Sequence, residues 1–259
     1  MDLLKYNRWA WDEQVSRGNK WTRPVSHEEI ESARKGEWEV VVTPTRPVPR
    51  AWFGDLSGKR VLCLAGGGGQ QAPILAAAGA HVTTIDNSPR QLERDQEVAQ
   101  REGLEIVTEL GDMRDLSSFP SESFDLVFNP CSNGFVDDVR AVWREVARVL
   151  KPGGSLITGF SNPLLFIFDY GELEQGRMKV THKIPYSDLE NLSEVELQKL
   201  RKDAEPVMFG HTLEDQIAGQ LDAGLQLTGM FEDVTSEGPD ALVGEHIPIY
   251  MATCAVKVS

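Results

Sequence analysis

Residues 61–71 read VLCLAGGGGQQ, an apolar run followed by four consecutive glycines from Gly66 to Gly69. Glycine loses more backbone freedom on folding than any other residue, so a run of four needs a structural reason. In an open parallel sheet, a glycine loop after the first strand lets a cofactor approach the backbone where the next helix begins. The stretch therefore predicts a nucleotide-like ligand beyond the strand, the alternative being a simple turn that joins strand to helix.

The chain on both sides of this loop alternates between strand and helix signals. Ser88, with Pro89 at the first helical position, predicts the start of one helix, and Gly103 predicts its end. This alternation predicts an α/β fold: a doubly wound, Rossmann-like sheet of seven strands, mostly parallel with an antiparallel last strand, and helices on both faces. The predicted strands are 60–65, 81–86, 104–110, 124–129, 155–160, 225–231 and 249–258, and the predicted helices are 71–80, 88–103, 137–150 and 212–224.

Two segments fall outside the alternation. The first 55 residues hold five of the six tryptophans and the proline-rich stretch TPTRPVPR at 43–50, which should be extended or turning. The rhythm also breaks after residue 160, where Ser187 and Ser193 mark helix starts that predict one short charged helix over 188–202. We expect a single domain with four parts: an N-terminal lid segment (1–55), a cofactor-binding half (56–160), an inserted substrate cap (161–210) and a C-terminal part (211–259).

Composition excludes several classes of protein. The chain has 259 residues, of which 41% are hydrophobic and 25% charged, as in ordinary globular proteins. Its formal net charge of −14 repels polyanions, so we expect no nucleic-acid partner. No apolar run approaches the roughly 18 residues of a membrane span, so we expect a cytoplasmic protein without a membrane partner, as a monomer or homodimer. Cys63, Cys131 and Cys254 form no CxxC pair, and neither a disulfide nor a metal site is predicted.

Five stretches in a fixed order resemble a known family. Between about residues 58 and 160 they are similar to the motifs of the class I S-adenosylmethionine-dependent methyltransferase superfamily, in a bacterial, type 11-like branch. The resemblance implies a Rossmann-like fold, S-adenosyl-L-methionine as the cofactor, and in-line methyl transfer to a small-molecule acceptor. The stretches are VLCLAGGGG (61–69), TIDNS (84–88), GDMRDL (111–116), FDLVFNPCS (124–132) and RVLKPGG (148–154).

The resemblance also implies which residues meet the cofactor. In family order they are Ala65, Gly66, Gly67 and Gly69 beside the methionine and ribose, Asp86 with Asn87 at the ribose hydroxyls, Gly111, Asp112 and Met113 at the adenine, and Asn129 with Pro130 near the reacting methyl. Cys63 and Ala65 depart from the family, which has an acidic residue and a glycine there. The acidic residue orients the loop and helps to seat the methionine ammonium, whereas Ala65 should only require a negative φ. Asp112 has the alternative interpretation of a turn former after Gly111.

Aromatic and imidazole side chains are further candidates. A sulfonium attracts the faces of aromatic rings, so Tyr6, Trp9 and Trp11 are predicted lid residues over the cofactor; alternatively, they bury the N-terminal segment against the core. His182 in the insertion and His211 directly after it are candidate catalytic bases, although surface or helix-capping histidines are more common. Cys131 is expected to be an inert loop thiol.

Two other classes of function remain open. Gly67, Gly69 and Ala72 satisfy the GxGxxA fingerprint of dinucleotide-binding proteins, so an NAD-dependent oxidoreductase is one alternative. None of the four tyrosines is followed by lysine four residues later, which argues against the short-chain type. A noncatalytic S-adenosylmethionine-binding protein is the other alternative, favoured by Cys63 and Ala65.

Overall fold

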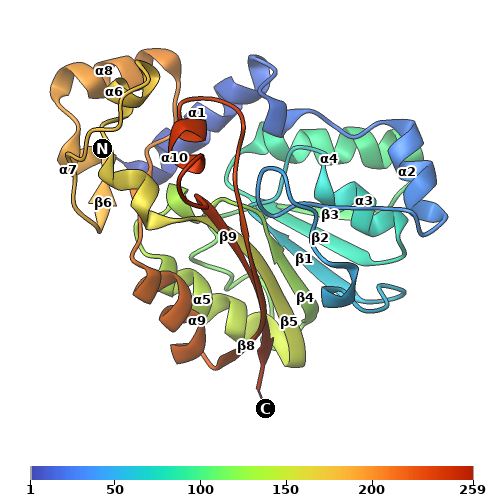
Figure 1. The fold of residues 1–259 in the computed structure, drawn as a ribbon. Helices are drawn as coiled ribbons and strands as arrows, with labels where there is room; N and C mark the ends of the chain where they lie inside the picture. Colours follow the sequence, from blue (N-terminus) through green and yellow to red (C-terminus); the bar gives the residue numbers. More distant parts are fainter. Residues whose placement is uncertain (1, 259) are drawn as a thin grey trace.

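A seven-stranded sheet forms the centre of the protein in the computed structural model, which describes residues 2–258 (Figure 1). The strand order is β3-β2-β1-β4-β5-β9-β8. Pairs from β3 to β5 are parallel, and β9 runs antiparallel to both of its neighbours, which confirms the predicted sheet. The strands are β1 (Arg60–Leu64), β2 (His81–Asp86), β3 (Ile106–Leu110), β4 (Phe124–Asn129), β5 (Leu150–Ser161), β8 (Leu225–Asp233) and β9 (Tyr250–Lys257).

The central strand β1 shows why this sequence builds a sheet covered on both faces. Its residues 61–64 are all fully buried, as expected of a parallel strand with helices on each side. Because side chains alternate along a strand, Val61 and Cys63 join one core cluster while Leu62 and Leu64 join the other. The apolar run before the glycines therefore joins two separate cores.

Helices cover each face of the sheet (Figure 1). One core contains side chains of α2 (His27–Arg34), α3 (Gln71–Ala77) and α4 (Pro89–Glu102). The other core is dominated by α5 (Val139–Val149), against which α9 (Gly219–Asp222) packs. The capping residues predicted for α4 are confirmed: the Ser88 side chain accepts a hydrogen bond from the Gln91 backbone, and Gly103 ends the helix with a φ of 66°.

The segments outside the alternation contain helices that the sequence did not predict or predicted differently. The N-terminal segment forms α1 (Leu3–Ser16) as well as α2. The single helix expected over 188–202 is two helices, α7 (Asp188–Asn191) and α8 (Glu194–Asp203). That prediction was wrong because Ser187 and Ser193 each act as an N-cap, and an N-cap residue has a non-helical backbone that separates the two helices.

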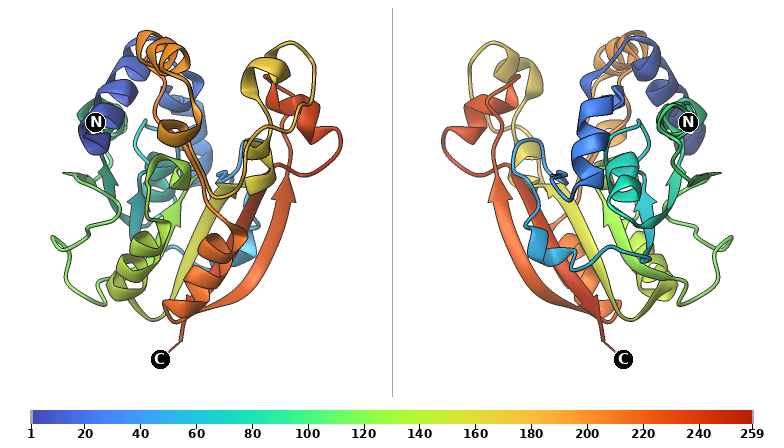
Figure 2. Two further views of the ribbon diagram at one scale, coloured as in Figure 1. Left: turned by 90° about the vertical axis from the view of Figure 1, so that its left-hand side faces the viewer. Right: turned by 90° about the vertical axis from the view of Figure 1, so that its right-hand side faces the viewer.

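The insertion and α10 lie above the carboxyl ends of the parallel strands (Figure 1). The insertion also contains α6 (Tyr170–Glu174) and the short pair β6 (Tyr186–Ser187) and β7 (Phe209–Gly210). A π-helical turn at Glu214–Ala218 precedes α9, and α10 (Asp240–Gly244) was not predicted. Figure 2 shows α1 beside α8 in one group and α6 beside α10 in another. Among residues 2–258, no helix has both the length and the apolar character to cross a bilayer.

Candidate functional site

A cavity of about 300 Å³ lies at the carboxyl ends of the central strands. The order of strands reverses between β1 and β4, which is where ligands bind in open α/β sheets. Eight of the residues predicted to meet a cofactor line this cavity: Ala65, Gly67, Asp86, Asn87, Gly111, Asp112, Met113 and Pro130. Four separate sequence motifs therefore meet at one place in the fold.

Other predicted residues do not line the cavity. Gly66 and Gly69 lie beside lining residues in the loop, and Asn129 is fully buried at the end of β4. The Asn129 amide donates to the Leu64 carbonyl at 2.8 Å, and its oxygen accepts from Thr158 Oγ1 at 2.9 Å. Asn129 thus joins β4 to the two neighbouring strands.

Three consecutive amides of the glycine loop are bound by the protein itself. The N–H of Gly67 donates to Asp86 Oδ2 at 3.0 Å, and the N–H of Gly68 donates to the Gln91 carbonyl at 2.9 Å. The N–H of Gly69 donates to Asp95 Oδ1 at 3.0 Å. The loop is therefore held against the end of β2 and the first turns of α4, and these three amides are not free to bind an anion.

The same contacts explain why these positions are glycine. A Cβ on Gly67 would lie 2.8 Å from Gln91 Cβ, one on Gly68 would lie 2.7 Å from the Trp21 carbonyl oxygen, and one on Gly69 would lie 2.9 Å from the Arg94 carbonyl oxygen. Gly68 and Gly69 also have positive φ, which side chains disfavour. The sequence interpretation, which assigned the glycines to ligand approach, missed that the protein packs against them first.

The backbone at Ala65 corrects another expectation. Its φ is 47°, in the left-handed region, whereas a negative φ was expected. The Ala65 N–H donates to the Ile85 carbonyl at 2.8 Å, so the chain must turn sharply while still bound to β2. Ala65 therefore has a backbone conformation that glycine adopts more easily than alanine does.

Asp86 lies at the end of β2 with both carboxylate oxygens used locally. Oδ2 accepts from Gly67 and Oδ1 accepts from the Ser88 N–H at 2.9 Å. Burial raises the pKa of Asp86 to about 6, although the backbone N–H groups of Ser88 and Gly67 favour the charged form. Asp86 thus links the loop to the start of α4 and presents a carboxyl group to the cavity.

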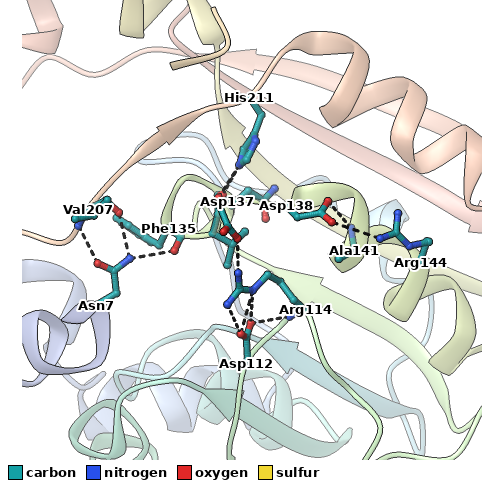
Figure 3. Close-up of polar contacts among 12 residues, drawn as sticks. Asn7, Asp112, Arg114, Phe135, Asp137, Asp138, Ala141, Arg144, Val207 and His211 are labelled. Atoms are coloured by element: carbon teal, nitrogen blue, oxygen red, sulfur yellow. Dashed lines mark hydrogen bonds and ion pairs between the residues drawn. The ribbon is translucent and has the colours of Figure 1, made fainter. Parts of the chain in front are cut away.

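Asp112 is bound by a neighbouring arginine (Figure 3). The Arg114 guanidinium holds both oxygens of Asp112 at 2.6–3.1 Å and also contacts Asp137. Asp112 Oδ1 additionally accepts the Arg114 backbone N–H at 2.9 Å, so the residue does shape a turn. The side chain of Asp112 both lines the cavity and forms this turn. Arg114 was not singled out from the sequence, although it stands within the quoted GDMRDL motif.

The opposite wall of the cavity comes from distant segments. Leu4, Asn7 and Trp11 share one face of α1 and all line the cavity. Asn7 anchors that helix: its amide donates to the carbonyls of Phe135 and Val207 at 3.0 and 3.1 Å, and its oxygen accepts the Val207 N–H at 2.8 Å (Figure 3). The Asn87 amide on the loop side donates to the Leu4 carbonyl at 2.9 Å, so α1 closes the cavity between two anchors.

The predicted lid rings divide into two groups. Trp11 lines the cavity and packs edge-on against Phe135, with ring centroids 5.2 Å apart. Tyr6 and Trp9 lie off the cavity: the Tyr6 hydroxyl donates to the Glu205 carbonyl at 3.0 Å, and Trp9 is 43% exposed. Trp21 lines the cavity but was not predicted, because no periodic pattern surrounds it.

Neither candidate base reaches the cavity wall. His211 is buried, and its Nε2 donates to the carbonyls of Asn133 and Val136 at 3.0 and 2.9 Å (Figure 3). Burial lowers the pKa of His211 below its ordinary value. The His182 ring packs edge-on against Tyr186, with centroids 5.1 Å apart. Both imidazoles have structural contacts that account for their positions.

Charge is distributed unevenly around the cavity. Among the lining residues that the structure describes, Asp86, Asp112 and Arg114 are the only charged ones, and all three belong to the motifs at the ends of β2 and β3. The far end is lined by neutral groups, including Ser161 and Tyr250, which face each other across β5 and β9. Burial raises the pKa of the Tyr250 phenol, so it remains a neutral hydrogen-bond donor.

Comparisons with known proteins agree with this geometry. Residues 62–158 match the family described as "Methyltransferase domain". The "Uncharacterized methyltransferase YbaJ" of Bacillus subtilis strain 168 is 49% identical over 256 residues, with 99% of both chains covered. A "Ubiquinone biosynthesis O-methyltransferase" of Xanthomonas oryzae pv. oryzae is 37% identical, but the match covers only 42% of this chain and 45% of that protein.

A solved structure shares the fold. The crystal structure of an S-adenosylmethionine-dependent methyltransferase from Mesorhizobium loti superposes with a TM-score of 0.61 at 20% identity, covering 80% of this chain and 94% of the other. At that identity the likeness concerns the arrangement of strands and helices.

Proposed function

The chain belongs to the family of S-adenosylmethionine-dependent methyltransferases, and from that premise we propose that it transfers a methyl group to a small, uncharged acceptor. The cofactor is S-adenosylmethionine, a sulfonium cation. The acceptor and the in-line geometry of transfer are the parts that we propose. They are supported by the distribution of charge and hydrogen-bonding groups around the cavity.

The choice of ligand is supported by the amides of the glycine loop, which the protein itself already binds. A dinucleotide needs free loop amides to bind its pyrophosphate, but the amides of residues 67–69 already donate to Asp86, Gln91 and Asp95. One of these acceptors, Asp86, lines the cavity and has a pKa of about 6, so at neutral pH its carboxylate would repel a pyrophosphate and attract a cation. The site therefore fits a sulfonium ligand without phosphates better than it fits NAD.

Named residues have clear tasks toward such a cofactor. When bound, S-adenosylmethionine supplies a methyl group that is already activated by the positive sulfur. Asp86 would accept hydrogen bonds from ribose hydroxyls, and Met113 with Gly111 would contact the adenine. The rings of Trp11 and Trp21 line the cavity and suit a cation through their faces. The chain's work is then to position two reactants and exclude water.

The acceptor end of the cavity supports an uncharged substrate. An ion bound there would have no countercharge, and burying an unpaired charge is costly. The side chains of Cys131, Ser161 and Tyr250 line this end and bring one thiol and two hydroxyl groups to it. These groups can hold a neutral hydroxyl, carbonyl or amine of an otherwise apolar molecule.

Proton removal is not part of the proposal. His182 and His211 lie outside the cavity wall, so a catalytic role for either stays a prediction. The lid role of residues 1–55 and the cap role of residues 161–210 are proposals too. They are supported by α1, which lines the cavity with several side chains, and by Ser161 and Met208, which lie within residues 161–210 and also line the cavity.

Calorimetric titration tests the choice of cofactor. We expect S-adenosylmethionine and S-adenosylhomocysteine to bind and NAD not to bind. Asp86→Ala should weaken binding of both adenosyl ligands by tenfold or more, because a charge-assisted hydrogen bond contributes about 1.5–3 kcal/mol. Glu93→Ala removes an exposed charge from α4 and is the matched control. Binding of NAD alone would refute the proposal.

Ligand-observed NMR tests the acceptor class. Phenol, benzoate and benzylamine share one ring and differ in charge, and each is added to protein saturated with S-adenosylhomocysteine. We expect phenol to bind most tightly of the three. The substitution Tyr250→Phe should lower the affinity for phenol. Tighter binding of benzoate or benzylamine, or no binding of phenol, contradicts an uncharged acceptor while leaving the cofactor assignment intact.

A further inference from the structure

Cys63 stands where the motif that this sequence resembles has an acidic residue. The motif at 61–69 resembles one in which an acidic side chain at this position orients the glycine loop. Cys63 is fully buried, and burial raises the pKa of its thiol, so it stays neutral. A thiol is a weak hydrogen-bond acceptor, so a strong acceptor for the loop must come from elsewhere.

Asp95 meets this requirement from the opposite side of the loop. It lies on α4 and is fully buried, and its Oδ1 accepts the Gly69 N–H at 3.0 Å. When ionised, it is close enough to Cys63 to raise the pKa of that thiol. A Cβ on Gly66 would lie 3.4 Å from Cys63 Cβ, so Cys63 on β1 and the Asp95 carboxyl on α4 both lie against the glycine loop.

The surrounding contacts make α4 a continuous support for the loop. One turn before Asp95, the Gln91 carbonyl accepts the Gly68 N–H at 2.9 Å. Gly69 lies so close to the helix that a Cβ there would lie 2.9 Å from the Arg94 carbonyl oxygen. Two turns of one helix thus bind two successive loop amides, one through the main chain and one through a side chain.

The second oxygen of Asp95 shows that the group is not serving a structural ion pair. Oδ2 is buried and has no hydrogen-bond partner among residues 2–258. Burial and the nearby Asp86 raise the pKa of Asp95 well above its ordinary value, which favours the protonated form. A buried carboxyl without a cationic partner is unfavourable for folding, so its retention calls for a specific task.

We propose that Asp95 is the positioning residue that holds the glycine loop in its cofactor-binding conformation, supplying from α4 the hydrogen-bond acceptor that Cys63 does not supply from β1. Asp95 does not line the cavity, so it acts on the ligand through the loop. Its effect on cofactor binding rests on the proposed function, whereas its hydrogen bond to Gly69 does not.

Two variants distinguish the hydrogen-bond acceptor of Asp95 from its negative charge. Asp95→Asn keeps an oxygen that can accept the Gly69 N–H, and Asp95→Ala removes it. We expect hydrogen exchange of the Gly69 amide, measured by NMR, to become at least tenfold faster in Asp95→Ala and to stay within about threefold of the parent in Asp95→Asn. The affinity for S-adenosylhomocysteine should follow the same order. Glu97→Ala, on the exposed face of α4, is the control and should change neither value.

A compensating variant tests the relation to Cys63. Adding Cys63→Asp to Asp95→Ala places a carboxyl group on β1 and should recover most of the lost affinity and amide protection. An unchanged Gly69 exchange rate in Asp95→Ala, or equal damage in Asp95→Asn and Asp95→Ala, would overturn the proposal. If the parent protein fails to bind S-adenosylhomocysteine, the proposed function fails, and the exchange rates still decide the role of Asp95.

Discussion

The two walls of the cavity are built in different ways. The loop wall is local: Asp86 binds Gly67 across 19 residues of sequence, within a single strand-helix-strand unit. The opposite wall joins segments far apart in the sequence, because Asn7 binds Val207 across 200 residues. The loop wall carries all the charged lining residues, and the opposite wall is neutral. The loop wall, which we propose binds the cofactor, can be identified from motifs, whereas the opposite wall depends on how distant segments pack.

The largest expected effect tests whether the loop wall depends on protein packing rather than on ligand space. In Gly68→Ala the new Cβ would lie 2.7 Å from the Trp21 carbonyl oxygen, at a φ of 113°. We expect a loss of about 3 kcal/mol in the free energy of unfolding without any ligand, from positive-φ strain and overpacking together. Gly36→Ala has a φ of 84° with open space around it and should lose only about 1 kcal/mol. Urea unfolding measures both, and equal losses would contradict the packing argument.

An intermediate effect tests how the opposite wall is anchored. Asn7→Ala removes three hydrogen bonds and leaves the backbone groups of Val207 buried without partners. We expect unfolding to become easier by about 2–3 kcal/mol. Lys5→Ala, on an exposed part of the same helix, should change stability by less than about 0.5 kcal/mol. If the two variants have the same stability, α1 is not anchored through Asn7.

The smallest expected effect is a pH dependence of ligand binding, which tests the role of the Asp86 charge on the loop wall. The pKa of Asp86 in the free protein is raised to about 6, so the carboxyl is mostly protonated at pH 5 and mostly ionised at pH 7. Ligand hydroxyls favour the ionised form, so S-adenosylhomocysteine affinity should rise by about tenfold from pH 5 to pH 7 and then level off. Calorimetry across this range measures the effect. Asp86→Asn should lose most of the dependence, and a flat profile for the parent protein would contradict the assignment.

The loop wall followed sequence rules closely. The strands predicted at 81–86 and 124–129 have those bounds, and the caps of α4 are as expected. The sequence predictions were wrong at positions where the same residue type is compatible with two backbone conformations. The two serine caps at Ser187 and Ser193 were read as parts of one helix, and Ala65 was assigned an ordinary φ because alanine usually has one. The first error concerns a local cap that separates two helices, whereas at Ala65 the hydrogen bond to β2 holds the backbone in its conformation.

By itself, the sequence determined the order of strands and helices, the family and the cofactor motifs, because hydrophobic periodicity, caps and glycine spacing act over a few residues. Only the tertiary structure decided which rings face the cavity. Tyr6, Trp9 and Trp11 stand on one helix, and only Trp11 shares the inward face with Asn7. The rotation of α1 is set by hydrogen bonds to Asn87 and Val207, which lie 83 and 200 residues away from their partners in the helix. Contacts at such separations leave no periodic pattern, so the opposite wall could not be predicted from the sequence.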